Sequence, residues 1–102
     1  MKKHVLFIQG GGNGGYEADA KLADSLKNSL GEKFDVQYPR MHVDESKPDF
    51  GWCQQIENEI ETVNGSIILV AHSLGASMLL KYLSENEIKK QIDGIFLFST
   101  PF

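Results

Sequence analysis

Residues 66–82, SIILVAHSLGASMLLKY, decide the fold of this chain. The apolar run at 67–71 is typical of a strand buried inside a sheet, and from Ala76 onward apolar residues recur at helical spacing. Between the two lies the cluster His72-Ser73-Leu74-Gly75. We therefore expect a strand, a sharp turn and a helix, with Ser73 on the turn.

The residues beside Ser73 are small. A strained turn from strand to helix closes only when there is little bulk two positions to either side, where this chain has Ala71 and Gly75. The Ser73 hydroxyl would then lie at the carboxyl end of the strand and at the positive end of the helix. The backbone N–H of Leu74 would face an oxyanion formed there. The alternative is that Ser73 merely caps the helix.

The motif Ala71-His72-Ser73-Leu74-Gly75 resembles the Gly-x-Ser-x-Gly pattern of the α/β-hydrolase superfamily, with alanine in place of the first glycine. The segment 38–56, with its Tyr-Pro, Pro-Asp-Phe and Trp residues, is similar to small cytoplasmic serine hydrolases of the retinoblastoma-binding-protein-9 and YdeN-like type. The resemblance implies hydrolysis of a small carboxylic ester or thioester through an acyl-enzyme on Ser73. We expect Trp52 to be a packing residue.

A glycine loop, residues 10–15, follows the apolar run at 4–9. Five glycines in these six residues indicate close backbone approach or positive φ angles. The loop resembles the family's His-Gly-Gly-Gly signature, with Gln9 where histidine is common. The resemblance implies that the backbone N–H of Gly11, or of Gly12, is the second oxyanion donor beside that of Leu74.

The same glycines permit a different interpretation. Gly10, Gly12 and Gly15 match the spacing of a dinucleotide-binding fingerprint. That site also needs an acidic residue at the end of the second strand, and Asp35 lies at the wrong end of the expected strand 34–38. No lysine follows the glycines as in nucleoside triphosphate sites. We favour the oxyanion loop over a dinucleotide site or a plain flexible loop.

The pattern of the whole chain, residues 1–102, predicts one α/β domain. Expected strands are 4–9, 34–38, 67–71 and 94–99, and expected helices are 17–30, 49–63 and one from 74. Helix 17–30 carries an apolar stripe and stops at Gly31, and Asp49 is the expected N-cap of the second helix. This order predicts a parallel sheet of about four strands flanked by helices, the N-terminal half of an α/β-hydrolase fold.

The catalytic triad is incomplete in this sequence. The family orders its triad serine, acid, histidine, yet no histidine follows Ser73. Asp93, the one aspartate after it, is expected at the opposite end of the sheet. His4 is also at that end, and we expect His72 to be packed or hydrogen-bonded away from Ser73. His42 is the one candidate for an unconventional base.

Two expectations follow from the missing base. The chain is expected to be part of a larger hydrolase and poorly active in this short form, and the alternative is a non-catalytic binding or interaction module with a hydrolase-like half-fold.

The strand 94–99, which holds Phe96 and Phe98, would be a bare sheet edge. We expect this edge to pair with a second copy in a homodimer.

The composition argues against several other classes of function. The net charge of −4 argues against nucleic-acid binding, and the single cysteine, Cys53, excludes an intramolecular disulfide and fits a reducing compartment. No signal peptide or membrane span is expected, so we predict a cytoplasmic protein. Histidines and acids do not cluster, so we expect no metal and no cofactor.

Tyr16, Met41 and the loop 39–48 are expected to line an acyl pocket.

Overall fold

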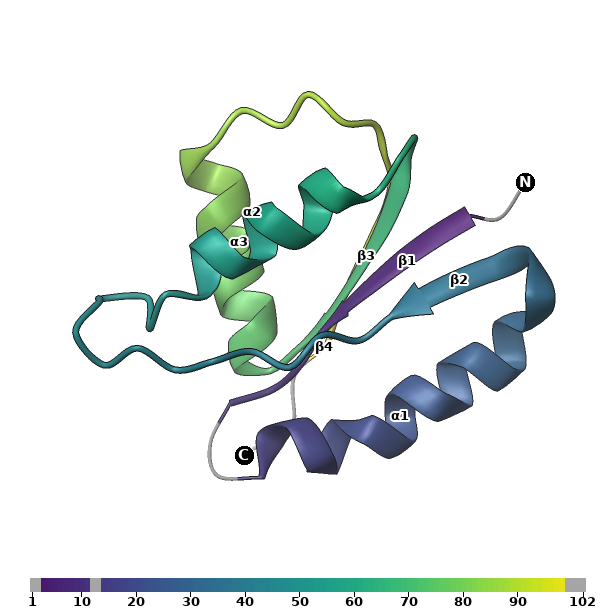
Figure 1. The fold of residues 1–102 in the computed structure, drawn as a ribbon, viewed down its shortest axis with the longest axis horizontal. Coiled ribbons are helices and arrows are strands. Elements are labelled where there is room, and N and C mark those ends of the chain that lie inside the picture. Colours follow the sequence, from purple (N-terminus) through teal and green to yellow (C-terminus); the bar gives the residue numbers. More distant parts are fainter. Residues whose placement is uncertain (1–2, 12–13, 99–102) are drawn as a thin grey trace.

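A computed structural model of the chain, which describes residues 3–11 and 14–98, has a parallel sheet flanked by helices (Figure 1). The elements in order are β1 (Lys3–Ile8), α1 (Gly15–Leu30), a short 3-10 turn (Gly31–Lys33), β2 (Phe34–Gln37), α2 (Trp52–Thr62), β3 (Ile67–His72), α3 (Leu74–Glu85) and β4 (Ile92–Phe98). The expected α/β order is confirmed. Ser99, the last residue of the expected fourth strand, lies outside the described residues.

The sheet has the strand order β2-β1-β3-β4, and all of its pairs are parallel. In the central pair, His4 lies beside Ile67 and Ile8 beside Ala71. Because β1 and β3 are covered on both faces, their apolar runs are continuous rather than alternating. Parallel strands also bring their carboxyl ends to one edge, so the glycine loop after β1 and the Ser73 turn after β3 are neighbours.

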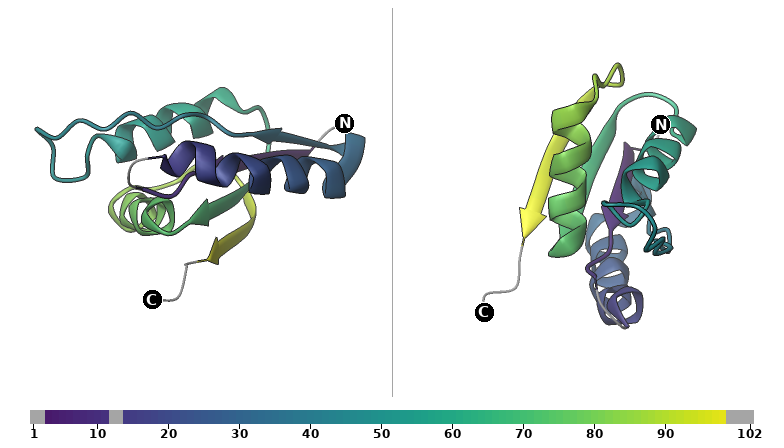
Figure 2. Two further views of the ribbon diagram at one scale, coloured as in Figure 1. Left: turned by 90° about the horizontal axis from the view of Figure 1, so that it is seen from below. Right: turned by 90° about the vertical axis from the view of Figure 1, so that its left-hand side faces the viewer.

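Helices cover both faces of the sheet (Figures 1 and 2), and each face has its own core. Helix α1 packs on one face with a cluster of buried residues (Val5, Phe7, Ala23, Val36 and Val70). Helices α2 and α3 cover the other face in a larger cluster that includes Leu6, Ile8, Trp52, Ile56, Leu69 and Leu79. Trp52 is 1% exposed, which agrees with its expected packing role.

Two details of the helices differ from expectation. Helix α2 is capped by Gly51, with φ 77°, and not by Asp49. Asp49 lies two residues before this cap. Its carboxylate accepts hydrogen bonds from the N–H groups of Gly51 and Cys53, at 2.9 and 3.3 Å. In α1, Leu22 is 41% exposed and Asp19 is buried, so the buried face is rotated from the expected apolar stripe.

Strand β4 leaves apolar side chains uncovered on both faces of the sheet. Ile95 and Leu97 pair with Leu69 and Ala71 of the larger core yet are 44% and 39% exposed. Phe96, on the opposite face, is 60% exposed. Parallel sheets are normally covered on both sides, and an open edge presents unpaired backbone groups. This edge is therefore suited to pairing with another strand.

From this edge we predict a homodimer in which two copies of β4 pair across a twofold axis. Light scattering should give a mass of twice the 11.4 kDa of the chain. Phe96→Lys should yield the monomer, because a lysine on an edge strand opposes pairing. The control Leu22→Lys places the same charge at an exposed apolar position of α1 and should remain dimeric. A monodisperse wild-type monomer would contradict the prediction.

Candidate active site

Ser73 occupies the turn between β3 and α3 in a strained backbone conformation. Its φ is 55° and its ψ is −120°, a region that residues other than glycine rarely adopt. Ser73 is the N-cap of α3, but its side chain makes no capping hydrogen bond. The capping interpretation is thus not supported. The Ser73 N–H donates to the Phe98 carbonyl at 2.9 Å, which joins the turn to the end of β4.

The residue two positions later, Gly75, is in close contact with the end of β1. A Cβ atom at Gly75 would lie 2.2 Å from the Gln9 carbonyl oxygen and 2.8 Å from that of Ile8. The sequence motif requires a small residue here for the turn, and the structure adds a second reason. Only a residue without a side chain lets the first turn of α3 lie this near to β1.

The same approach places Gly11 and Leu74, the two residues predicted to supply oxyanion donors, in contact. A Cβ atom at Gly11 would lie 2.4 Å from the Leu74 Cδ2 and 2.9 Å from its Cβ, so the two residues are in contact. As the first residue of α3, Leu74 has no acceptor for its N–H within the helix. The second candidate donor in the glycine loop, Gly12, lies outside the described residues.

A cleft of about 430 Å³ opens beside this contact. Its lining includes Gly11 and Leu74, together with Gln9, Gly14, Gly15, Tyr16, Glu17, Arg40, Met41, Val43, Glu45, Phe50 and Trp52. The residues expected to form an acyl pocket, Tyr16, Met41 and parts of the loop 39–48, therefore face the same space as the two candidate donors. A volume of several hundred Å³ is usual for a small-molecule site.

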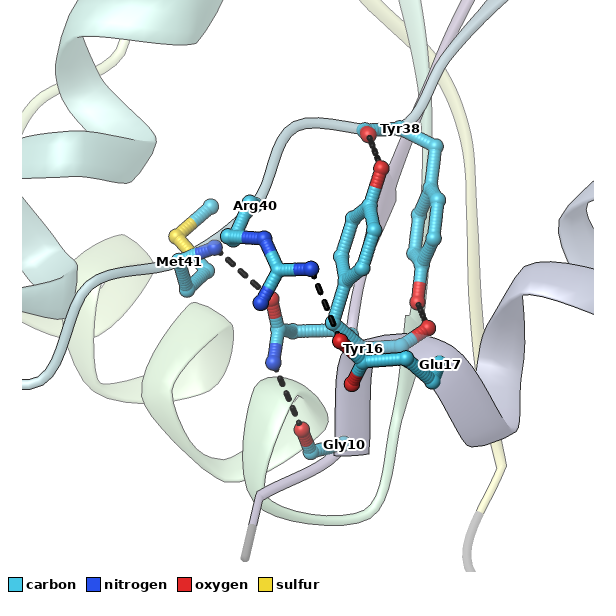
Figure 3. Close-up of polar contacts among 7 residues, drawn as sticks. Gly10, Tyr16, Glu17, Tyr38, Arg40 and Met41 are labelled. Carbon is cyan, nitrogen blue, oxygen red and sulfur yellow. Dashed lines mark hydrogen bonds and ion pairs between the residues drawn. The ribbon is translucent and has the colours of Figure 1, made fainter. Parts of the chain in front are cut away.

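One wall of the cleft is a clamp of aromatic and charged residues (Figure 3). Tyr16 and Tyr38 are stacked at 4.5 Å, and the Tyr38 hydroxyl donates to the Tyr16 carbonyl at 2.6 Å. The Arg40 guanidinium lies 4.3 Å from the Tyr16 ring centre and pairs with Glu17 at 2.8 Å. The Arg40 hydrogen bond lowers the pKa of Glu17, and burial raises the pKa of Tyr38, so Glu17 stays charged and Tyr38 neutral. The clamp joins α1 to the segment after β2.

Gln9 joins the glycine loop to the same segment. Its side chain is 6% exposed; the amide oxygen accepts the Met41 N–H at 2.7 Å and the amide nitrogen donates to the Gly10 carbonyl at 3.2 Å. The resemblance marks position 9 as one where histidine is common. In this chain the neutral amide of Gln9 accepts one hydrogen bond and donates another, and so joins Gly10 to the segment after β2.

Asp19 was not predicted as part of this site. The residue is 6% exposed, and its Oδ2 accepts the Gly10 N–H at 2.7 Å and lies 2.9 Å from the Nδ1 of His72. His72 follows Val70 by two residues on β3, so its side chain points to the same face, toward α1. His72 is thus hydrogen-bonded toward α1, as expected, and its partner is the unexpected finding.

The other histidines lie away from Ser73 or outside the cleft. His4 is at the start of β1, 3.7 Å from Asp35. The Asp93 carboxylate accepts a hydrogen bond from the hydroxyl of Ser66, just before β3. His42 is exposed; its neighbours Met41 and Val43 line the cleft and it does not. Within the described part of the chain, the hydrogen bonds of His42 are those of its backbone with Gln55, and none engages its ring as a base.

Asp19 also bears on the dinucleotide interpretation. The N–H of Gly10 already donates to a carboxylate, which places negative charge where that interpretation needs a phosphate. The dinucleotide interpretation gains no support. Within residues 3–11 and 14–98, no three His, Cys, Asp or Glu side chains gather as metal ligands. None of the described helices is long and apolar enough to cross a membrane.

Comparison with known proteins identifies a family. A family model described as serine hydrolase matches residues 18–102, which includes the Ser73 turn, all of α2 and α3, and the segment between β2 and α2. The glycine loop precedes the matched part. No curated protein and no solved structure matches the chain.

The contact at Gly75 generates a first prediction for this site. Gly75→Ala should lower the free energy of unfolding by about 2 kcal/mol or more, because its Cβ meets backbone atoms that cannot rotate away. Gly65→Ala is the control, since its Cβ would meet nothing within 4 Å and only its φ of 86° is strained; it should cost about 1 kcal/mol. Urea unfolding measures both. Equal losses would contradict the close contact.

Cys53 generates a second prediction. Burial, and next the Asp49 carboxylate, raise the pKa of this thiol to about 11. The thiolate population at pH 8 should therefore be roughly a hundredfold below that of an ordinary cysteine. Iodoacetamide should alkylate Cys53 correspondingly more slowly in the native chain than in urea, as followed by mass spectrometry. Asp49→Asn should restore only part of the rate, because burial is the larger cause. Equal native and denatured rates would show the prediction to be wrong.

Proposed function

The chain belongs to the serine hydrolase family, and from that premise we propose that it hydrolyses small carboxylic esters or thioesters through an acyl-enzyme on Ser73. The observation that carries the proposal is the strained Ser73 turn, whose side chain is not used as a helix cap. Strain of this kind persists where the surrounding structure holds it, and it accumulates at functional sites.

The proposed reaction uses the Ser73 hydroxyl and the N–H groups of Gly11 and Leu74. Gly11 and Leu74 line the cleft; Ser73 does not line it, but directly precedes Leu74. The Ser73 hydroxyl oxygen attacks the acyl carbonyl carbon, and the carbonyl oxygen becomes an oxyanion. The N–H groups of Leu74 and Gly11 donate to that oxyanion. The bond from the acyl carbon to the alcohol oxygen or thiol sulfur breaks, and this leaving group takes up the proton that the Ser73 hydroxyl lost. Water then attacks the acyl-enzyme, its oxygen becomes part of the released acid, and one of its protons restores the Ser73 hydroxyl. The contact between Gly11 and Leu74 supports this assignment, because two donors must converge on one oxygen.

The acyl group is proposed to occupy the cleft of about 430 Å³. Much of its lining is apolar or aromatic, including Met41, Val43, Phe50, Trp52 and Leu74. An uncharged acyl chain suits these walls better than a phosphorylated or polyanionic group, since the charged lining residues are Glu17, Glu45 and Arg40. We also propose a cytoplasmic location, which the lone thiol of Cys53 favours.

Turnover is proposed to be slow. A serine needs a base to be a strong nucleophile at neutral pH, and no histidine follows Ser73 in the sequence. Loss of the histidine in a triad costs about 10⁶ in kcat, and a residual rate roughly 10³ above water comes from the oxyanion hole and binding. We expect this chain to be in the residual range.

A non-catalytic binding module is the second candidate, and the missing histidine favours it. Such a module would keep the cleft and the hydrolase-like sheet but would use Ser73 only as a turn residue. The two candidates differ in one measurable property, the dependence of ester hydrolysis on the Ser73 hydroxyl.

Hydrolysis of p-nitrophenyl acetate and of a matched thioester tests the proposal. The wild-type chain should show slow turnover that Ser73→Ala reduces to the buffer rate. Ser77→Ala removes an exposed hydroxyl one turn later on α3 and should change nothing. If all three proteins hydrolyse both substrates at one rate, the hydrolase proposal fails and the binding module remains.

A further inference from the structure

The buried carboxylate of Asp19 lies at the junction of three segments. It belongs to the second turn of α1, yet its Oδ2 accepts the N–H of Gly10 in the glycine loop at 2.7 Å. The same oxygen lies 2.9 Å from Nδ1 of His72, the last residue of β3. A single oxygen atom thus joins α1, the loop after β1 and the end of β3.

Both partners of Asp19 adjoin groups assigned to the proposed chemistry. Gly10 directly precedes Gly11, the proposed oxyanion donor of the loop, and His72 directly precedes Ser73. The peptide plane whose N–H is that of Gly11 begins at the carbonyl of Gly10, and that carbonyl accepts the Gln9 side chain at 3.2 Å. The Gly10 residue is therefore held at its N–H by Asp19 and at its carbonyl by Gln9.

The junction is tightly packed. A Cβ atom at Gly10 would lie 3.1 Å from both the Asp19 Oδ2 and the His72 Nδ1, so a side chain there would require these neighbours to move by a few tenths of an ångström. An ionised carboxylate can only accept hydrogen bonds, so with Asp19 ionised His72 carries a proton on Nδ1. Two donors on one buried carboxylate oxygen make strong, charge-assisted hydrogen bonds. Gly10, the first residue of the glycine loop, is thereby fixed at its N–H.

We propose that Asp19 is a positioning residue of this site, whose carboxylate holds the Gly11 N–H and the Ser73 turn in the arrangement that receives a substrate oxyanion. The inference rests on the proposed function for its chemical meaning, but the geometry that it predicts can be measured without turnover. Asp19 does not touch the reacting atoms. It acts through Gly10 and His72.

The test compares Asp19→Asn with Asp24→Asn. Both remove one negative charge from α1 without changing side-chain size, but Asp24 is exposed. In ¹H–¹⁵N correlation spectra of the full chain, Asp19→Asn should move the amide of Gly10 upfield, because a charge-assisted bond is lost, and should displace those of Gly11 and Leu74. The amide of Ile95 in β4 should stay in place, and Asp24→Asn should move none of these.

Kinetics give the second arm. With p-nitrophenyl acetate, Asp19→Asn should lower kcat roughly 10- to 100-fold, because displaced oxyanion donors act mainly on the transition state. KM should change less than about threefold, since ground-state binding in the cleft is not altered. A role in folding alone would instead lower the fraction of native protein and leave the kcat of the folded fraction unchanged.

The two arms separate the possible failures. If the wild type has no Ser73-dependent turnover, the proposed function fails, and the amide shifts alone decide the positioning role. Unmoved Gly11 and Leu74 amides in Asp19→Asn overturn the proposal, whatever the activity. If the wild type does turn over, an unchanged kcat in Asp19→Asn also overturns it. Asp19→Ala is a weaker test, because it leaves both partners unsatisfied and risks unfolding the chain.

Discussion

The contact between Gly75 and the carbonyl oxygens of Ile8 and Gln9 is the constraint on which the rest of the site depends. It holds the first turn of α3 against the carboxyl end of β1. Leu74 consequently touches Gly11, and Ser73 lies at the strand ends where open parallel sheets bind their ligands. A side chain at position 75 would separate these segments, so the packing of the fold and the proposed chemistry require the same missing Cβ.

Gly10, at the start of the glycine loop, is held by contacts from other segments, because a glycine by itself favours no single conformation. Asp19 holds it from the side of α1, and Gln9 holds it from the side of the segment after β2. The stacked rings of Tyr16 and Tyr38 keep that segment next to α1 and shape the cleft. Oxyanion stabilisation works best when its dipoles are oriented before the reaction begins, and buried polar contacts of this kind provide such orientation.

The fold followed from the sequence because its determinants are local. The apolar runs, the stop at Gly31 and the small residues around Ser73 act over a few residues, and the structure confirms the parallel sheet and the strained turn. The Asp19 contacts could not be predicted, because they depend on which face of α1 meets the sheet. The sequence held one indication of these contacts. Asp19 precedes Ala23 by one turn and so lies on the same apolar face of the helix, where a charged residue is unusual. The N-cap of α2 was predicted wrongly for a similar reason, since a carboxylate at 49 serves N–H groups equally well from outside the helix. The catalytic roles of Ser73, Leu74 and Gly11 stay predictions.

We propose that the fold presents Ser73 as a nucleophile beside oxyanion donors. A fluorophosphonate probe tests this proposal directly, since attack by the Ser73 oxygen on its phosphorus releases fluoride and is assisted by donors to the phosphoryl oxygen. Without a triad histidine the labelling should be slow, so the exposure is long. After digestion, mass spectrometry should find the adduct on Ser73, with none on the neighbouring Ser77 and none after the chain is denatured in urea. An unmodified Ser73, or an adduct spread equally over the serines of native and denatured chains, would contradict it.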